Sequence, residues 1–224
     1  MTLHPIILLS TMLCVVTSQA FAQTTARGRV DLSVGARWTG ETSVGAADAT
    51  ETAAAGNRYR LFTTDSALVS MVGVETRVDV RLTRAVEAEV AASYGARDLR
   101  TRIRSDVEGV PDTEAVEKVG QVSLEASLVV HLTRWPIARR ATPFVTAGGG
   151  YLRELHEGRT LAETGAMYHA GGGLTMMLRS GGRGLLKATG WRADARAVVR
   201  TGGIVFSDEL RVAPAVGLSL FARF

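Results

Sequence analysis

Three histidines, His131, His156 and His169, have the side chains best suited to catalysis or metal binding after residue 23. Imidazole can serve as a general base, a proton shuttle or a metal ligand near neutral pH. A hydrolase or a metalloenzyme would also need partners at set spacings, such as a Ser-His-Asp order, an HExxH-type pair or a phosphate loop. The sequence has none of these motifs. We therefore predict no catalytic residue, no metal site, no cofactor and no enzymatic activity.

Two of the histidines have plainer explanations than catalysis. His131 falls on the polar face of an alternating segment, where an acid such as Glu125 can pair with it. His156 stands beside Glu154 and Glu157 in a segment that we predict to be a solvated loop, with a metal site as the less favoured alternative. Both residues are accounted for by the charges around them.

Apolar and polar residues alternate along most of the chain after residue 23. Between residues 30 and 38 every second residue is apolar, and Asp31 and Arg37 lie on the opposite face. Such alternation indicates β-strands with one apolar and one polar face. The pattern predicts about eight strands, each near or above the ~9–11 residues of a tilted membrane strand. They cover residues 30–38, 68–82, 86–97, 122–132, 142–155, 165–178, 185–200 and 208–224.

The connections between these strands alternate between long and short. Long polar segments follow the odd-numbered strands, at residues 40–65, 105–117, 156–164 and 201–207. Short segments follow the even-numbered strands, at residues 83–84, 134–141 and 179–184. This alternation is typical of an up-and-down antiparallel barrel whose N-terminus lies on the side of the short turns.

The polar face carries arginine and acidic residues in near balance and almost no lysine. A face that merely meets water would favour lysine, whereas arginine suits paired, poorly hydrated contacts. A soluble barrel such as a lipocalin, with its apolar face inward, shows the same alternation and is the alternative. We predict instead that a charge network fills a narrow lumen. Its members are Asp31, Arg37, Glu75, Arg77, Asp79, Arg81, Glu87, Glu89, Arg97, Glu125, Arg192, Asp194 and Arg196.

Residues 1–22 have the pattern of a cleaved secretory signal peptide. A mostly apolar run over residues 6–16 is followed by polar residues and by Ala20-Phe21-Ala22, an A-x-A cleavage site. The one cysteine is Cys14, so residues 23–224, which we assign to a single barrel domain, fold without disulfides or thiolate metal sites. The net charge of +4 is spread along the chain, so we expect no nucleic-acid partner.

The last strand is the most specific part of the pattern. Residues 216–224 alternate up to the terminal Phe224, and glycine-rich stretches follow Phe144 and Tyr168 at residues 147–151 and 170–174. In these features the sequence resembles the small bacterial outer-membrane β-barrel proteins, such as the transmembrane domain of OmpA and the OmpW-like proteins. Pro214 departs from the pattern, since proline removes a ladder hydrogen bond, and we expect it near the outer rim.

The resemblance implies an all-β fold, an eight-stranded antiparallel up-and-down transmembrane β-barrel with long extracellular loops and short periplasmic turns. It implies a location in the bacterial cell outer membrane, in a Gram-negative cell envelope. It also implies that Phe224 belongs to the assembly signal read by the barrel-assembly machinery. Lipid A deacylases of similar size use a histidine with a serine two residues later, and here Gly171 takes that position after His169.

A basic cluster follows the third predicted strand. If the alternation continues, Arg100, Arg102 and Arg104 point outward above the apolar band. Guanidinium groups at that height could hold phosphates of lipopolysaccharide, because arginine binds phosphate in a bidentate manner. A solvated strand extension is the simpler alternative.

These features leave three functions open. We favour a monomeric structural or interaction barrel whose lumen is filled by paired Arg, Asp and Glu side chains. A narrow OmpW-like channel for small or apolar solutes is the alternative, and it would need inward glycines such as Gly35, Gly171 and Gly217 to leave a gap. Surface adhesion or binding through residues 40–65 is the third.

Overall fold

The computed structural model describes residues 29–54, 56–105, 107, 111–133, 141–156, 161–180, 184–204 and 210–224. The predicted signal peptide and parts of several predicted connections lie outside these residues. Within the described ranges, no helix is long and apolar enough to cross a membrane.

The described residues form ten strands in one antiparallel sheet. The strands are β1 (Val30–Thr39), β2 (Thr42–Thr52), β3 (Arg58–Leu68), β4 (Met71–Arg81), β5 (Val86–Arg104), β6 (Thr113–His131), β7 (Ala141–His156), β8 (Ala162–Ser180), β9 (Ala188–Gly202) and β10 (Arg211–Arg223).

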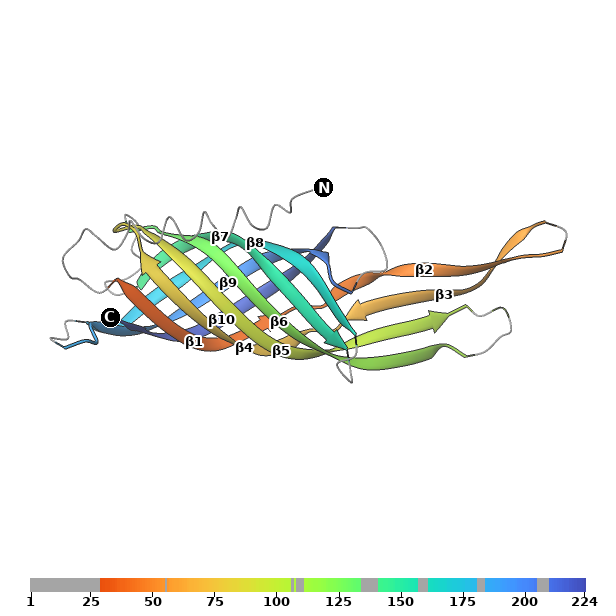
Figure 1. Ribbon diagram of the computed structural model, residues 1–224, viewed down its shortest axis with the longest axis horizontal. Helices are drawn as coiled ribbons and strands as arrows, with labels where there is room; N and C mark the ends of the chain where they lie inside the picture. The colour runs from red at the N-terminus through yellow and green to blue at the C-terminus, as the bar shows by residue number, and fades with distance from the viewer. Residues whose placement is uncertain are drawn as a thin grey trace, which may run out of the picture.

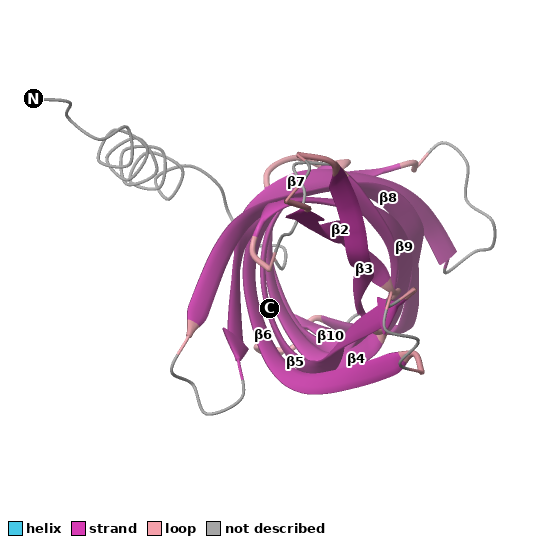
Figure 2. Ribbon diagram, turned by 90° about the vertical axis from the view of Figure 1, so that its right-hand side faces the viewer, coloured by secondary structure: helices cyan, strands magenta, loops and turns pink. Residues whose placement is uncertain are grey.

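Eight of these strands close into a ring. Strand β1 pairs with β4 on one side and with β10 on the other, and β5 to β10 follow one another around the ring. The view along the barrel shows the closed wall around a narrow interior (Figure 2). Closure leaves no unpaired sheet edge at membrane depth, which a hydrocarbon environment requires. The predicted eight-stranded antiparallel barrel is confirmed.

The remaining two strands correct the prediction for residues 40–65, which do not form a loop. Strands β2 and β3 form a hairpin that projects from one end of the barrel (Figure 1). At that end β3 pairs with the last residues of β5, from Leu99 to Arg104. Tyr59 and Thr63 of β3 donate hydrogen bonds to Glu51 and Asp48 of β2. Polar cross-strand pairs of this kind stabilise a hairpin outside the apolar core, so hydrophilic composition did not mean irregular structure.

Strands β5 and β6 also extend further than the sequence indicated. The predicted loop over residues 105–117 is shorter, because β6 begins at Thr113. His156, which we placed in a loop, is the last residue of β7, and its Nδ1 lies 2.8 Å from Glu117. The two ends of the barrel therefore differ mainly in how far the strands continue past the ring.

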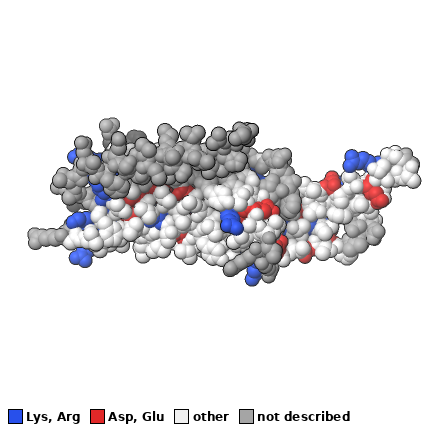
Figure 3. All heavy atoms as spheres, in the orientation of Figure 1, with Lys and Arg blue, Asp and Glu red and all other residues white. Residues whose placement is uncertain are grey.

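The outer surface of the barrel is apolar. Leu220, at 63% exposure, and its neighbours on successive strands point away from the lumen. The lower side of the barrel in Figure 3 is mostly white, and the projecting β2–β3 hairpin carries both blue and red atoms. The exposed apolar residues of the ring include Leu32, Val34, Val72, Val74, Val78, Val90, Tyr94, Leu124, Leu128, Val145, Tyr151, Tyr168, Val216 and Leu218. A lipocalin-like barrel would have the opposite polarity.

Candidate functional site: the charged lumen

The predicted charge-network residues all lie on the inward face of the ring. Twelve of the thirteen are buried, and Arg81 at one rim is partly exposed. Burial of so many ionised groups is tolerated only where each charge has a partner, because desolvation of an isolated ion is very costly.

Arg37 of β1 crosses the middle of the lumen. Its guanidinium contacts Glu75 of β4 at 2.8 Å and makes a two-nitrogen contact with Glu125 of β6. Strands β4 and β6, which carry the two carboxylates, lie on either side of β5 in the ring. One side chain therefore links three strands through the interior.

Asp194 of β9 joins two further arginines. Arg77 of β4 lies 2.8 Å from this carboxylate, and Arg196 of β9 itself lies 3.0 Å from it. Arg77 also contacts Glu75, and Arg196 lies 3.3 Å from Glu89. The contacts form one continuous network across the barrel.

Arg192 extends this network toward the end where the chain terminates. It lies 2.7 Å from Glu89 and 3.4 Å from Asp79, and its guanidinium stacks 4.2 Å from the centre of the Phe144 ring. The aromatic face gives the cation a further favourable contact in a region with little water.

The rim of the barrel at the end where the chain terminates carries a separate group of charge pairs. Arg223 of β10 donates to Asp31 of β1, with Nε 2.7 Å from Oδ1. Glu87 accepts from Arg81 at 2.8 Å and contacts Nε2 of His131, also at 2.8 Å. His131 therefore pairs with a lumen acid, as the sequence indicated, and that acid is Glu87 of the neighbouring strand and not our example, Glu125.

Glu154 organises the opposite, membrane-distal part of the lumen. It is fully buried, lies 2.9 Å from Arg97 and also contacts Arg200, and it accepts a hydrogen bond from the backbone N–H of Ile204. Glu154 and Arg200 were absent from the predicted network, as was Arg223. The alternation along each strand could have identified these residues. Glu154, for example, stands two residues after Leu152 and therefore points inward like it.

An apolar cluster lies above the charges at this end. Its members come from the projecting strands, from the barrel wall and from the residues after β9, and they are Val44, Leu68, Leu99, Val119 and Ile204. The N–H that Ile204 donates to Glu154 ties the cluster to the charge network. This end of the lumen is thus covered by side chains that bring no charge to a passing ion.

His169 lies between a serine and a carboxylate in the middle of the lumen. Its Nε2 is 3.0 Å from the hydroxyl of Ser127, and its Nδ1 is 3.1 Å from Glu125. The order serine, imidazole, carboxylate matches that of a hydrolytic triad. All three side chains are buried, Glu125 also contacts Arg37, and neither Ser127 nor His169 lines any of the cavities described below.

The inward glycines leave no gap in the wall. A Cβ atom at Gly35 would stand 2.1 Å from the backbone oxygen of Leu218, and one at Gly171 would stand 2.2 Å from that of Ala195. At Gly217 the nearest atoms would be those of Asp194 and Arg77. Close strand approach and the charge network occupy the space that larger residues would need.

The three predicted lipopolysaccharide-contact residues lie on the membrane-distal extension and are partly exposed. Arg100 and Arg102 of β5 each have Nε 2.9 Å from Glu114, and Arg104 lies 3.7 Å from Asp65. The side chains in these three ion pairs are all partly exposed, so the pairs lie at the surface of the extension.

Pro214 of β10 and Phe224, which follows β10, lie at opposite ends of the ladder between β1 and β10. The backbone N–H of Phe224 donates to Val30, next to the pairing of β1 with β10. Pro214 lies just beyond the last β1–β10 pair, Thr39 with Ala215, and its carbonyl accepts from Gly40 at 2.8 Å. Its missing N–H therefore falls at the membrane-distal end of that ladder, at the rim. Among the described residues no group of His, Asp and Glu side chains is arranged to hold a metal ion.

Comparisons with known proteins agree with this architecture at the level of fold. No family model and no curated protein matches the chain. The outer membrane protein OprG from Pseudomonas aeruginosa is 11% identical and covers 88% of this chain and 96% of its own, with a TM-score of 0.54. The N-terminal β-barrel domain of Pseudomonas aeruginosa OprF covers 87% and 99% of the two chains at 14% identity and a TM-score of 0.39. The attachment invasion locus protein Ail of Yersinia pestis covers 89% and 100% at 13% identity and a TM-score of 0.38.

The chain therefore has the fold of a small bacterial outer-membrane β-barrel, as the sequence predicted. An apolar outer surface around a charged interior is the polarity of a barrel that stands in lipid. Together the fold and this polarity support the predicted localisation in the bacterial outer membrane.

Proposed function

We propose that the protein is an integral outer-membrane barrel with a closed lumen, which carries a membrane-distal β-sheet as an interaction surface. The observation that carries the proposal is the ion-pair network that crosses the lumen from Arg37 to Arg196. An eight-stranded barrel has an interior just wide enough for side chains to fill.

The free space inside the lumen supports this proposal. Between the central charges and the membrane-distal ones lies a cavity of about 20 Å³, lined in part by Arg37, Arg97 and Arg200. That is room for about one or two ordered water molecules. An ion crossing the barrel would have to displace buried salt bridges and then the apolar cluster around Val119.

The narrow channel is the second candidate, and the inward glycines count against it. A pore would need the small residues to stack beside open space. Here the space beside Gly35, Gly171 and Gly217 is taken by backbone or by charged side chains.

The membrane-distal sheet is the part offered to partners. Strands β2, β3, β5 and β6 continue beyond the ring, with exposed Tyr59 and Val116 and the ion pair of Arg60 with Asp48 on their surfaces. Adhesion or binding through residues 40–65, the third function that the sequence left open, would use this sheet and not a flexible loop.

Conductance of the refolded protein in a planar bilayer tests the closed lumen. We expect no discrete current steps from the wild type. The double substitution Arg37→Ala and Arg196→Ala removes two cations that span the lumen, and we expect steps from it, which shows that the assay detects an opened barrel. Arg153→Gln on the outer surface is the matched control. Regular steps from the wild type would overturn the closed-lumen proposal and favour the channel.

The partners remain proposals. We propose contacts with outer-membrane lipid and with lipopolysaccharide, recognition of the strand that ends at Phe224 by the barrel-assembly machinery, and a monomeric state. The apolar belt supports the first, and the partly exposed guanidinium groups of Arg100, Arg102 and Arg104 support the second.

A further inference from the structure

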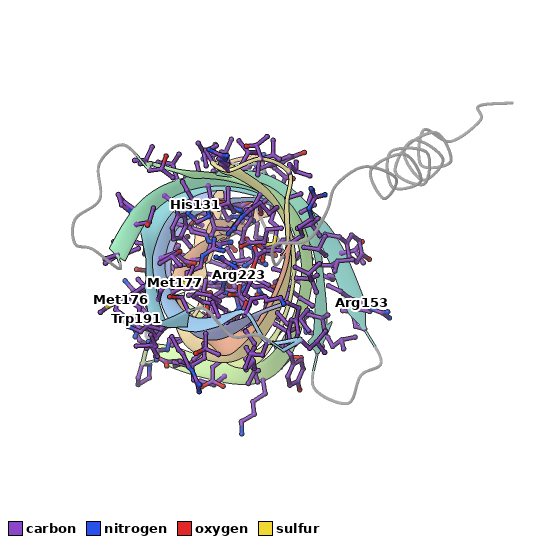
Figure 4. All side chains as sticks on the ribbon, turned by 90° about the vertical axis from the view of Figure 1, so that its left-hand side faces the viewer. His131, Arg153, Met176, Met177, Trp191 and Arg223 are labelled. Carbon is purple, nitrogen blue, oxygen red and sulfur yellow. The ribbon has the colours of Figure 1, made fainter. Side chains whose placement is uncertain are left out.

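A cavity of about 170 Å³ opens at the end of the barrel where both chain termini of the ring meet. Its walls come from the ends of β4, β6 and β10, the start of β7 and the last part of β8. In the view from this end, His131, Met177 and Arg223 lie inside the ring, whereas Met176, Trp191 and Arg153 point outward (Figure 4). The lining residues are Arg81, Arg84, His131, Thr133, Thr142, Thr175, Met177 and Arg223.

Among the described residues, the lining is cationic and contains no acid. Arg81, Arg84 and Arg223 contribute three guanidinium groups, and the carboxylates of Asp31 and Glu87 stand behind them, deeper in the lumen. In the described linings of the two adjoining cavities, four arginines (Arg81, Arg84, Arg192 and Arg223) stand against three acids (Asp31, Asp79 and Glu87), which leaves one positive charge uncompensated. The local field therefore favours an anion in the cavity.

The two acids fix the guanidinium groups without using all their donors. Arg81 contacts Glu87 through Nε and Nη2, and Arg223 contacts Asp31 through the same two nitrogens. The Nη1 atoms of both arginines make no hydrogen bond in the described part of the chain. Arg84, in the turn after β4, has no carboxylate partner among the described residues. Positioned donors of this kind bind an oxyanion with little loss of side-chain freedom.

Hydroxyl groups complete the lining. Thr133, Thr142 and Thr175 stand around the same cavity. Thr175 is only 8% exposed, and its Oγ1 has no hydrogen-bond partner in the described structure. A buried hydroxyl without a partner costs free energy, which a bound acceptor would offset.

We propose that this periplasm-facing cavity binds a phosphoryl group, either inorganic phosphate or a small phosphate monoester. Three guanidinium groups and three hydroxyls can donate hydrogen bonds to more than the two oxygen atoms of a carboxylate. A tetrahedral phosphoryl group has three or four acceptor oxygens. The cavity lies inside the ring of strands, which favours a soluble phosphate over a phospholipid headgroup as its source.

Titration of the full-length protein in lipid nanodiscs with inorganic phosphate, at constant ionic strength in chloride, tests the proposal. We expect saturable binding by calorimetry. Arg84→Gln should weaken it about tenfold, the effect of one lost charge-assisted contact, and Thr175→Val should weaken it by a smaller factor. Arg153→Gln removes an arginine from the outer surface and should leave the affinity unchanged. A mobility shift between unboiled and boiled samples checks that every variant is folded.

Two further measurements distinguish a soluble phosphate from a phospholipid headgroup as the ligand. Glycerol 3-phosphate should compete with phosphate, and enrichment of the nanodisc in phosphatidylglycerol should leave the phosphate affinity unchanged. If the phospholipid competes and the soluble ester does not, the site holds a headgroup and the proposed soluble ligand is wrong. Absence of saturable phosphate binding by the wild type, or equal affinities of the Arg84→Gln and Arg153→Gln variants, would overturn the site itself. Neither result bears on the closed lumen, which the conductance measurement tests separately.

Discussion

A single guanidinium inside this barrel stabilises several strands at once. Arg37 is 5% exposed and contacts Glu75 and Glu125, which come from two other strands. Replacement of Arg37 by Met would remove one positive charge from beside two buried carboxylates. We expect Arg37→Met to lower the free energy of unfolding by about 3–5 kcal/mol, the range for breaking a buried ion pair.

Urea unfolding in lipid, followed by the loss of gel mobility of the folded form, measures this effect. Arg58→Gln, on the exposed hairpin, is the control, and we expect a change below about 1 kcal/mol there because surface pairs contribute little. Equal effects of the two substitutions would contradict a cooperative lumen network.

Glu114 makes the membrane-distal extension sensitive to acid. The hydrogen bond from Arg102, with help from the charge of Arg100, lowers the pKa of the Glu114 carboxyl below its usual value. The folded state therefore gains stability from this carboxylate above the pKa of the unfolded chain, and it loses that contribution as the pH falls through the lowered, folded pKa.

Hydrogen–deuterium exchange of the β5–β6 tip measures the loss. We expect protection of the amides near Thr113 to fall as the pH falls into the acid range, after correction for the intrinsic exchange rate. In Glu114→Gln the protection should be lower at neutral pH and should no longer depend on the pH. A wild-type tip with constant protection would contradict the prediction.

Alternation predicted which charged residues face inward, but it did not predict their partners. The position of Arg37 follows from the period of two, whereas its contact with Glu125 depends on the stagger of strands that are 88 residues apart in sequence. Glu154 was missed because acidic neighbours at the end of a strand resemble a loop. Its role depends on Arg97, Arg200 and Ile204, which are brought to it from other parts of the chain by closure of the ring.

The β2–β3 hairpin is an element that the barrel can lose in part. Ring closure uses β1, β4 and β10, and only the base of the hairpin contributes to the apolar cluster, through Val44 and Leu68. We expect that replacement of residues 48–63 by Asn-Gly, which favours a tight hairpin turn, leaves the folded barrel intact.

The heat-dependent mobility shift of the shortened protein checks this expectation. Deletion of Val44 and Leu68 together with the hairpin is the comparison, and it should lower the temperature at which the shift is lost. If the shortened protein with both residues retained fails to fold, the hairpin is part of the barrel core.

The extension of β5 allows the lipopolysaccharide contact to be tested directly. We expect the triple substitution of Arg100, Arg102 and Arg104 by Gln to reduce the lipopolysaccharide that co-purifies with the folded protein, because the terminal nitrogens no longer carry charge. Arg58→Gln and Arg60→Gln on the hairpin form the matched control. Unchanged co-purification in the triple variant would exclude the contact.

At the scale of elements, the sequence predicted the barrel strands better than the strands outside the membrane. Inside lipid, a period of two is imposed by the contrast between the lumen and the apolar belt. Beyond the ring both faces of β2 and β3 meet water. Polar residues such as Thr50 and Thr63 therefore do not alternate with apolar ones, and the sequence shows no period of two. Hairpin and loop then have similar compositions.

The whole molecule is expected to behave as one cooperative unit in detergent. The ring is closed by hydrogen bonds on every side, so we expect unboiled protein from membrane fractions to migrate differently from boiled protein. The partly opened double variant of Arg37 and Arg196 should lose the shift at a lower temperature. Recovery of the wild type as a soluble periplasmic protein without a shift would contradict the membrane barrel.

The pairing of β1 with β10 also has a kinetic consequence. Asp31 bonds to Arg223, 192 residues away in sequence, so the barrel wall cannot be completed until the last strand has been delivered. Such long-range pairing makes folding slow, because loop-closure entropy is lost before the native contacts form. The exported chain must therefore remain unfolded, with its apolar residues exposed, for the whole interval between translocation and insertion. Its survival depends on protection during that interval as much as on the stability of the finished barrel.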